Sequence, residues 1–473
     1  MAGELLTTTT RVRRGLSLAL LAASGLLVGC TAVATVGGAP EPEPPLPQGF
    51  TVAFNHRSGN RYRSPVSGEW RQGDDLEAML LNAISSARRS ILVAVQELSL
   101  PRVAEALVAQ QRRGIKVQVV LENTYSQEWS EQHLADLSPR ERRRHQQLQA
   151  LGGGDAVAIL RRGGVPMLDD TADGSAGSGL MHHKFLVIDE AVVVTGSANF
   201  TASGLHGDAG APQTRGNVNH LLQIESPELA ELFRAEFHRL WGDGPGGAAD
   251  SRFGLGKDSP GLQRVRVRGT PVAVLFAPHR RRDRANGVEQ LDSLLKQTRR
   301  SADLALFVFS DQQLGNTLGQ LHRRGVAIRL LADPGFANRS FSEVLDLLGV
   351  ALPDHRCALE AGNAPQRQPL EGVGTPRLAS GDKMHHKLAV LDQRTVVTGS
   401  FNWSPSAAHQ NDETLLIIES PQLAAHFTRE IDRLWKGAEL GISARLQRKR
   451  DRQQRLCGRG RQRLVQDGPV RSG

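Results

Sequence analysis

The chain has 473 residues, of which 39% are hydrophobic, and this supplies ample material for a two-domain core. Its formal net charge is +9 at neutral pH, but residues 441–473 alone contain ten Lys or Arg and two Asp, a net charge of +8. The remaining residues are therefore nearly neutral, which argues against a strongly basic groove for nucleic acid. With only 4% aromatic residues, the chain also offers no evident stacking platform for single strands.

Residues 1–30 predict an export signal. Arginines between positions 11 and 14 form a positive n-region, and residues 15–29 are an apolar, small-residue stretch too short to span a bilayer comfortably. The stretch ends in Leu-Val-Gly-Cys at Cys30, which resembles a bacterial lipobox. In this interpretation Cys30 is diacylated, and the protein is exported and lipid-anchored to a bacterial membrane, facing the periplasm or the exterior. An uncleaved anchor and an ordinary secretory signal are the alternatives.

The two ends of the chain predict no domain of their own. Residues 31–49 contain five prolines and predict an extended tether. Residues 438–473 are basic and poor in apolar side chains, so we expect a disordered or weakly helical tail. This tail can bind anionic lipid headgroups or nucleic acid, or it can be merely solvated.

Residues 50–241 and 263–437 predict two like domains of strand and helix units. In the first, strands are expected at 52–54, 91–95 and 115–121, and helices at 74–89 and 102–111. Arg-Arg-Ser recurs at 88 and 299, and Glu-Ser-Pro recurs at 225 and 419. Such a long-range repeat indicates a duplicated unit, and the Gly/Pro-rich residues 242–262 are the expected linker.

Each predicted domain also has insertions that the other lacks. Residues 138–141, Ser-Pro-Arg-Glu, predict a helix that begins with a capping box and a proline at its first position. Loops are expected at 203–216 in the first domain and at 353–383 in the second. Loops at such positions usually set substrate choice.

The strongest signal is a segment at 181–200 that returns at 384–403 with 12 of 20 positions identical. Both copies fit the frame H-x-K-x4-D-x6-G-S-x-N. The first copy supplies His182, Lys184, Asp189, Ser197 and Asn199, and the second supplies His385, Lys387, Asp392, Ser400 and Asn402.

The spacing within each copy suits phosphoryl chemistry. On a strand, the His and Lys of H-x-K share one face, because side chains alternate with period two. Gly-Ser then lets the backbone bend and brings the Asn back towards the His and Lys. Each copy therefore offers a nucleophile or proton carrier, a fixed cation and an amide donor. Asp189 and Asp392 are expected at turns, where carboxylates accept backbone N–H bonds.

The doubled motif resembles the HKD signature of the phospholipase D superfamily of phosphodiesterases. The resemblance implies an α/β fold of two duplicated phospholipase D-like α/β/α sandwich domains, with one shared active site at their interface. It implies that one imidazole attacks phosphorus to give a covalent phosphohistidine, while the other protonates the leaving oxygen and then activates water. Two lysines and two asparagines would stabilise charge on the non-bridging oxygens. No metal or other cofactor is implied, and two motifs in one chain remove the need for a dimer.

A second histidine follows each motif histidine, so His183 and His386 invite a metal interpretation. Neighbouring residues on a strand cannot both face one ion. We therefore expect His183 and His386 to point to the opposite face of the strand and to hydrogen-bond within the core.

The two halves differ downstream of the motifs. Many members of the superfamily carry an acidic residue there that hydrogen-bonds the motif histidine, and by resemblance Glu413 would do this for His385. The first half has Asn219 at the aligned position, and Asp208 in the inserted loop is an alternative partner. A carboxylate partner favours the protonated imidazole. The hypothesis is therefore that His182 is the nucleophile and His385 is the general acid and base.

The motif leaves the substrate open, because the superfamily includes phospholipases, cardiolipin synthases that transfer instead of hydrolysing, and nucleases. A lipid anchor would put this enzyme beside phospholipid, so we predict hydrolysis of a phospholipid headgroup ester to phosphatidate. The His-His-Lys doublets also resemble the superfamily's secreted nucleases. An anchored extracytoplasmic nuclease and a phosphatidyltransferase are therefore the alternatives. A binding protein on an inactive scaffold is disfavoured, because every motif His, Lys and Asn is present.

Two cysteines remain besides Cys30. Cys357 is expected in a loop and Cys457 in the tail. They can pair in an oxidising compartment, but the sequence does not establish that they do.

Overall fold

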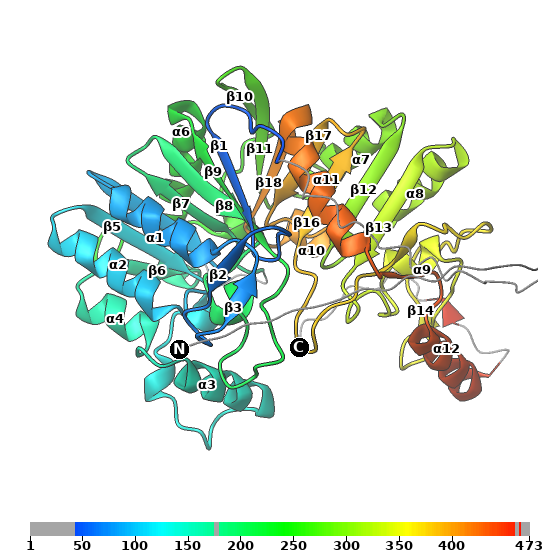
Figure 1. The fold of residues 1–473 in the computed structure, drawn as a ribbon, viewed down its shortest axis with the longest axis horizontal. Coiled ribbons are helices and arrows are strands. Elements are labelled where there is room, and N and C mark those ends of the chain that lie inside the picture. Colours follow the sequence, from blue (N-terminus) through cyan, green and yellow to red (C-terminus); the bar gives the residue numbers. More distant parts are fainter. Residues whose placement is uncertain (1–42, 175–178, 459–462, 465–473) are drawn as a thin grey trace, which may run out of the picture. The chain divides into compact units, whose positions relative to one another are not determined.

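The structure is a computed structural model that describes residues 43–174, 179–458 and 463–464 (Figure 1). The predicted export signal, the lipidation site Cys30 and residues 31–42 of the predicted tether lie outside the described residues. Among the helices that are described, none combines the length and the apolar character that crossing a membrane requires.

The first half contains a seven-stranded mixed sheet in the order β1-β9-β8-β7-β4-β5-β6. The strands are β1 (Phe50–Phe54), β4 (Ser90–Val95), β5 (Lys116–Leu121), β6 (Met167–Asp169), β7 (Lys184–Ile188), β8 (Val192–Gly196) and β9 (His220–Glu225). Strands β4, β5 and β6 run parallel, and β7, β8, β9 and β1 continue the sheet as antiparallel neighbours. One face is covered by α1 (Leu76–Ser86), α2 (Pro101–Arg112) and α4 (Ala156–Arg162), and the other by α6 (Pro227–Trp241).

The second half repeats this strand order within a nine-stranded sheet, β10-β11-β18-β17-β16-β12-β13-β15-β19. The strands are β10 (Gln263–Val267), β11 (Thr270–Ala277), β12 (Ser301–Leu306), β13 (Ala327–Ala332), β15 (Val373–Thr375), β16 (Lys387–Leu391), β17 (Thr395–Gly399), β18 (Glu413–Glu419) and β19 (Glu439–Leu440). One face is covered by α7 (Gly287–Gln297), α8 (Gln312–Arg323), α9 (Glu343–Leu347) and α10 (Pro405–His409), and the other by α11 (Pro421–Trp435). The predicted duplicated α/β fold is confirmed.

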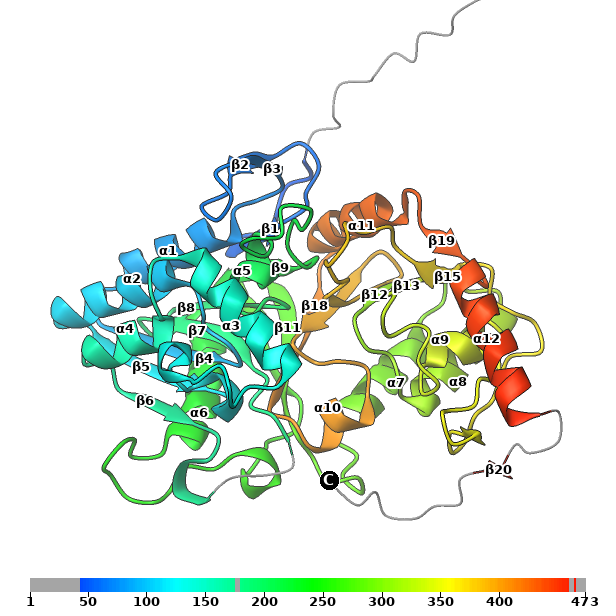
Figure 2. The ribbon, with the colours of Figure 1, turned by 90° about the horizontal axis from the view of Figure 1, so that it is seen from below.

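The two halves share one hydrophobic cluster. It contains Phe185 and Phe233 from β7 and α6 together with Leu388 and Phe427 from β16 and α11. Figures 1 and 2 show the two sheets with their helix layers, and the labels of β11 and β18 lie between the two halves. The strands that carry the two motifs are therefore parts of one continuous core.

Local sequence explains where the main helices begin. The hydroxyl of Ser138 accepts from the backbone N–H of Glu141, whose carboxylate accepts from the N–H of Ser138, so the predicted capping box opens α3 (Pro139–Leu151). The hydroxyls of Ser226 and Ser420 accept from the backbone N–H groups of Leu229 and Leu423 and so cap α6 and α11. Each serine is followed by proline at the first helical position. The remaining short elements are β2 (Arg61–Arg63), β3 (Trp70–Gln72), α5 (Ala202–Leu205), β14 (Ala358–Leu359) and β20 (Arg463–Leu464).

The tail was expected to be disordered or weakly helical, and its described part contains a helix. Residues 439–440 form β19, and α12 (Ala444–Cys457) begins at the cap Ser443. Leu446 of α12 is buried in the core of the second half, and Cys457 forms a disulfide with Cys357. A buried leucine and a covalent link to the loop hold this helix on the second half, an attachment that composition alone did not indicate.

Candidate active site

Backbone contacts between the halves bring the two motif histidines together. The N–H of His182 donates to the carbonyl of Asp412 (2.9 Å), and the N–H of His385 donates to the carbonyl of Val218 (3.1 Å). Short parallel bridges join the same segments, Met181 with Asp412 and Val218 with Met384. The first residues of each motif therefore contact the other half. They lie at the edge of the sheet where β4 ends in the first half and where β12 ends in the second.

Glu413 contacts the histidine of the other half. Its Oε2 lies 2.7 Å from Nδ1 of His182 and accepts a hydrogen bond from the hydroxyl of Ser400 at 2.6 Å. The expected pairing of Glu413 with His385 is therefore wrong. Glu413 is the first residue of β18, and it lies where the two halves meet, so the imidazole it reaches belongs to the first motif.

Asn219 has the matching position in the first half. Its Oδ1 lies 3.0 Å from Nδ1 of His385 and accepts from the hydroxyl of Ser197 at 2.8 Å. An amide oxygen can only accept, so Nδ1 of His385 carries the hydrogen and Nε2 keeps its lone pair. Asp208, the alternative partner from sequence, instead accepts from Gln147 of α3 at 2.9 Å.

The two motif lysines have different surroundings. Nζ of Lys184 donates to the carbonyl of His182 (2.7 Å) and lies 3.5 Å from Oε1 of Gln96. Nζ of Lys387 contacts the carbonyl of His385 (2.9 Å) and its Nε2 (3.2 Å), and it lies 4.9 Å from the centre of the Phe307 ring. The ammonium of Lys184 thus lies beside a polar side chain, whereas that of Lys387 makes a cation–π contact.

Gln96 and Phe307 are site residues that the sequence analysis missed. Gln96 also accepts from Nδ2 of Asn199 (3.1 Å), whereas the Phe307 ring packs against His385 with 4.6 Å between ring centres. The sequence contains a signal for both, because each residue directly follows an apolar strand, β4 or β12, that ends beside a motif. The outcome is a site that is polar around His182 and partly apolar around His385.

The motif asparagines have free hydrogen-bonding capacity. The Oδ1 atoms of Asn199 and Asn402 are buried and have no partner among the described residues. Both side chains are half-buried. Their amide groups can therefore bind a ligand that enters the site.

Two lysines and two histidines lie close together in the buried interior of the site. Burial lowers the pKa of Lys184 to about 7, although nearby Glu413 opposes the change. Burial and the neighbouring Lys184 lower the pKa of Lys387 well below its usual range, and burial together with both lysines does the same for His182 and His385. Burial raises the pKa of Glu413 to about 7. An entering anion such as a phosphodiester would favour the charged lysines.

The motif aspartates lie at turns, as predicted. Asp189 and Asp392 have φ of +52° and +53°. The carboxylate of Asp189 accepts backbone N–H bonds from residues 88–90, and that of Asp392 accepts them from residues 299–301. Each aspartate ties the turn after its motif strand to the start of β4 or β12.

His183 and His386 face the core, as predicted. His183 contacts Thr414 (2.8 Å) and Glu236 (3.1 Å) and is fully buried. His183, Glu236 and Asp412 could in principle hold a metal ion. The ammonium of Lys257 already lies between the two carboxylates, in contact with Glu236 and 2.7 Å from Asp412. This ammonium occupies the place a cation would take, so the cluster is an internal ion-pair network.

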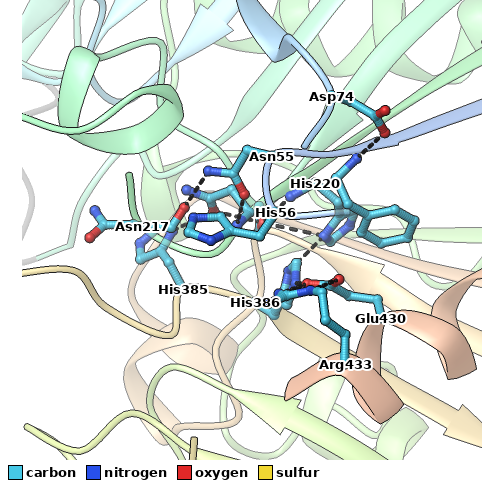
Figure 3. A network of polar contacts seen from close by, with 12 residues as sticks. Asn55, His56, Asp74, Asn217, His220, His385, His386, Glu430 and Arg433 are labelled. Atoms are coloured by element: carbon cyan, nitrogen blue, oxygen red, sulfur yellow. Dashed lines mark hydrogen bonds and ion pairs between the residues drawn. The ribbon is translucent and has the colours of Figure 1, made fainter. Parts of the chain in front are cut away.

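The corresponding cluster around His386 is built differently. Its Nδ1 lies 2.9 Å from Nδ1 of His220, and its Nε2 lies 3.1 Å from the carboxylate of Glu430, which Arg433 also binds (Figure 3). Figure 3 shows His220 reaching across from the first half to the pair His386 and Glu430. His220 stands at the position that Thr414 has in the second half. The two motif strands are therefore supported by polar networks of different composition.

Comparison with known proteins identifies a family. The family model described as "Cardiolipin synthase, PLD-like domain", where PLD is phospholipase D, matches residues 80–241 and 291–435. The human mitochondrial cardiolipin hydrolase is 33% identical over 156 residues, which is 32% of this chain and 53% of that protein. A phospholipase D of Rickettsia bellii is 27% identical over 136 residues, 29% of this chain and 55% of that protein. The chain thus spans about half the length of the curated relatives it matches.

One solved structure shows the same fold. The phosphatidylserine synthase of Haemophilus influenzae has a TM-score of 0.50 at 14% identity, and the alignment covers 82% of this chain and 89% of that one. Nuc from Salmonella typhimurium, a phospholipase D family member, covers 43% of this chain at 21% identity with a TM-score of 0.26. The family model matches both halves, including both motifs. The chain belongs to the family of cardiolipin synthase, phospholipase D-like domain proteins.

Proposed function

We propose that this protein is a phosphodiesterase that hydrolyses a phospholipid headgroup ester to phosphatidate through a covalent phosphohistidine. The observation that carries the proposal is the pair of motif imidazoles in one site, each fixed at Nδ1 by a partner from the other half. A fixed Nδ1–H leaves Nε2 of each ring to act on substrate. Lys184, Lys387 and the amides of Asn199 and Asn402 would surround the phosphate oxygens.

His182 is the proposed nucleophile. Its Nε2 lone pair forms a bond to phosphorus, the bond from phosphorus to the leaving oxygen breaks, and His385 gives that oxygen its Nε2 proton. The phosphorylated ring of His182 is an imidazolium, and the carboxylate of Glu413 on its Nδ1–H would stabilise this positive charge. The sequence also favoured His182 as the nucleophile, but on the expectation that the carboxylate of Glu413 is paired with His385. Here the reason is that the carboxylate on His182 would stabilise the covalent intermediate.

His385 is the proposed general acid and base. Binding of an anionic diester favours its protonated form, and the neutral partner Asn219 leaves the imidazolium a stronger acid than a carboxylate partner would. After the first step, neutral His385 takes a proton from water, the water oxygen bonds to phosphorus, and the bond between phosphorus and His182 breaks. Glycerol or another alcohol in place of water would give transfer instead of hydrolysis.

A lipid is favoured over nucleic acid as the substrate. The curated relatives carry the names cardiolipin hydrolase and phospholipase D, and the excess positive charge of the chain lies in residues 441–473. Nucleic-acid cleavage is the alternative outcome of the test below.

The test compares phosphatidylcholine and phosphatidylglycerol vesicles with single- and double-stranded DNA. Each is incubated with the parent protein, with His182→Ala and with EDTA. Headgroup release that survives EDTA and is lost in His182→Ala supports the proposal. DNA cleavage with the same two controls, and no lipid turnover, would make the protein a nuclease. Release of a transfer product with added glycerol would assign phosphatidyl transfer.

We also propose that the protein is exported and anchored through a diacylated Cys30. The support is the sequence pattern of residues 1–30, together with the disulfide between Cys357 and Cys457, which suits an oxidising compartment. Labelled palmitate should enter the parent protein and not the Cys30→Ala variant. Equal labelling of both would rule out this anchor.

A further inference from the structure

Helix α12 (Ala444–Cys457) is attached to the second half along one side. Leu446 is buried, Nζ of Lys449 donates to the carbonyl of Asn338 (2.6 Å), and Nε2 of Gln453 donates to the carbonyls of Pro353 and Asp354 (3.1 and 3.0 Å). Cys457 adds the disulfide to Cys357. Figure 2 shows α12 at the border of the second half, beside β19.

A different side of α12 carries only arginine. Four exposed residues share the spacing i, i+3, i+7 and i+10, which keeps them on one stripe of a helix. They are Arg445, Arg448, Arg452 and Arg455. None of these side chains makes a hydrogen bond or an ion pair with another residue of the described chain. We call these four residues the arginine stripe.

Exposed apolar side chains lie at both ends of α12 and in the loop to which the helix is attached. Leu456, at the C-terminal end of α12, is 66% exposed, and Leu440 and Ile442, just before its N-terminus, are 41% and 42% exposed. Phe341, near the Asn338 carbonyl that Lys449 binds, is 42% exposed. Large apolar side chains in water beside unpaired cations suit a membrane surface, because phosphates bind the arginines and the headgroup boundary receives the apolar groups. A nucleic-acid backbone would use the charges and leave these side chains in water.

Contacts link α12 to the segment that precedes the second motif histidine. Lys449 of α12 binds the segment that follows β13, and that segment begins with Asp333, whose carboxylate accepts from the N–H of Met384 (3.0 Å). Met384 directly precedes the catalytic His385. Helix α12 is thus connected, through one loop, to the edge of the sheet that carries the second motif.

We propose that α12 is a docking helix for an anionic lipid bilayer, with the arginine stripe on lipid phosphates and the neighbouring apolar side chains at the headgroup boundary. Docking there would hold the second half against the membrane. The binding does not depend on which diester the site cleaves, so it can hold or fail independently of the proposed function.

The experiment measures cosedimentation of the full chain with vesicles of phosphatidylglycerol and phosphatidylcholine in equal parts, and with phosphatidylcholine alone. All proteins carry Cys30→Ala, so that no acyl anchor supplies binding, and His182→Ala, so that lipid is not consumed. The stripe variant replaces Arg445, Arg448, Arg452 and Arg455 by Gln. The matched control replaces four other exposed arginines by Gln, so that the same charge is removed away from α12. Two precede β4 and β12 and two lie on β10, namely Arg88, Arg299, Arg264 and Arg266.

The parent should bind the anionic vesicles and not the neutral ones. Because an anionic surface attracts each arginine near it, the stripe variant should lose affinity at least about tenfold, and the control should lose less than about twofold. Leu456→Asn should weaken binding to anionic vesicles without changing its salt dependence. Equal losses in the stripe variant and the control would overturn the proposal, as would absence of binding by the parent.

Two further measurements complete the test. Melting temperature, and activity on bis(p-nitrophenyl) phosphate measured with His182 intact, should be unchanged by the stripe substitutions, which shows that the variant is folded. A gel-shift with double-stranded DNA gives the competing outcome. If the stripe variant loses DNA binding and keeps vesicle binding, α12 is a nucleic-acid surface and not a membrane surface.

Discussion

Oε2 of Glu413 and Nδ1 of His182 lie 2.7 Å apart although the two residues belong to different halves of the chain. Glu413 is fully buried and His182 is 7% exposed. Asn219 of the first half makes the corresponding contact with His385 of the second half. In each half, therefore, the residue that fixes Nδ1 of the motif histidine comes from the other half.

Glu413→Gln should lower kcat/KM strongly. A carboxylate that orients a catalytic histidine is worth about 10²–10⁴-fold in rate, and here it would also stabilise a phosphorylated imidazolium on His182. The variant should be measured by steady-state kinetics with a soluble diester and by trapping the phosphoenzyme. Glu371→Gln, an exposed residue in a loop, is the matched control. Similar rates for the two variants would remove Glu413 from the proposed mechanism.

Asn219→Asp should act on the other histidine. A carboxylate at this position favours the protonated form of His385, so the step in which neutral His385 takes a proton from water should begin at a higher pH. The pH profile for breakdown of the phosphoenzyme should shift upward, while its formation changes less. An unchanged profile would mean that the Asn219 contact does not tune His385.

The activity should have a narrow pH optimum near 7. Glu413 must be ionised, and burial raises its pKa to about 7, so activity should fall as pH drops through that value. Lys184 must be protonated, and burial lowers its pKa to about 7, so activity should fall again as pH rises. Lys184→Arg should remove the alkaline decline, because arginine stays protonated. A flat profile between pH 5 and pH 9 would contradict both assignments.

The sequence predicted the duplicated fold and both motifs because the repeat is long and its polar positions are fixed by strand geometry. It did not predict the partner of Glu413. Spacing along the chain reports which residues share a strand, but the contact with His182 depends on how the two sheets pack, and no pattern within one half contains that information. The sequence allowed a weakly helical tail and a pairing of Cys357 with Cys457, but it did not predict that α12 packs on the second half. The burial of Leu446 and the closeness of the two cysteines depend on where the loop at residue 357 lies in space.

Glu343 should make the stability of the protein depend on pH. Its side chain is buried, and burial together with the charges of Glu360 and Asp346 raises its pKa from 4.5 to about 9. The folded state then keeps a proton that the unfolded state releases near pH 4.5, so this contribution to stability is full below that pH and is lost as pH rises towards 9. Glu343→Gln should raise the melting temperature at pH 8.5 and leave it unchanged at pH 4. No gain at pH 8.5 would contradict the prediction.

Lys257→Ala should destabilise the protein by about 3–5 kcal/mol, because it leaves the buried carboxylates of Glu236 and Asp412 without their shared cation. The free energy of unfolding from urea titration measures the effect. Lys296→Ala, which removes an exposed lysine paired with Asp292, is the control and should cost about 1 kcal/mol or less. Prolonged dialysis of the parent protein against EDTA should leave its unfolding curve unchanged, since an ammonium holds this cluster together.

The disulfide between Cys357 and Cys457 closes a loop of 100 residues and fixes the C-terminal end of α12. Replacing both cysteines by serine should lower the free energy of unfolding by about 2–4 kcal/mol, since the unfolded chain regains the freedom that the cross-link removes. Dithiothreitol should lower the melting temperature of the parent protein to that of the double variant and leave the melting temperature of the double variant unchanged. If reduction does not affect the parent, the two cysteines are not linked in solution. Limited proteolysis should then cut between α12 and the second sheet at the same rate with and without the reductant.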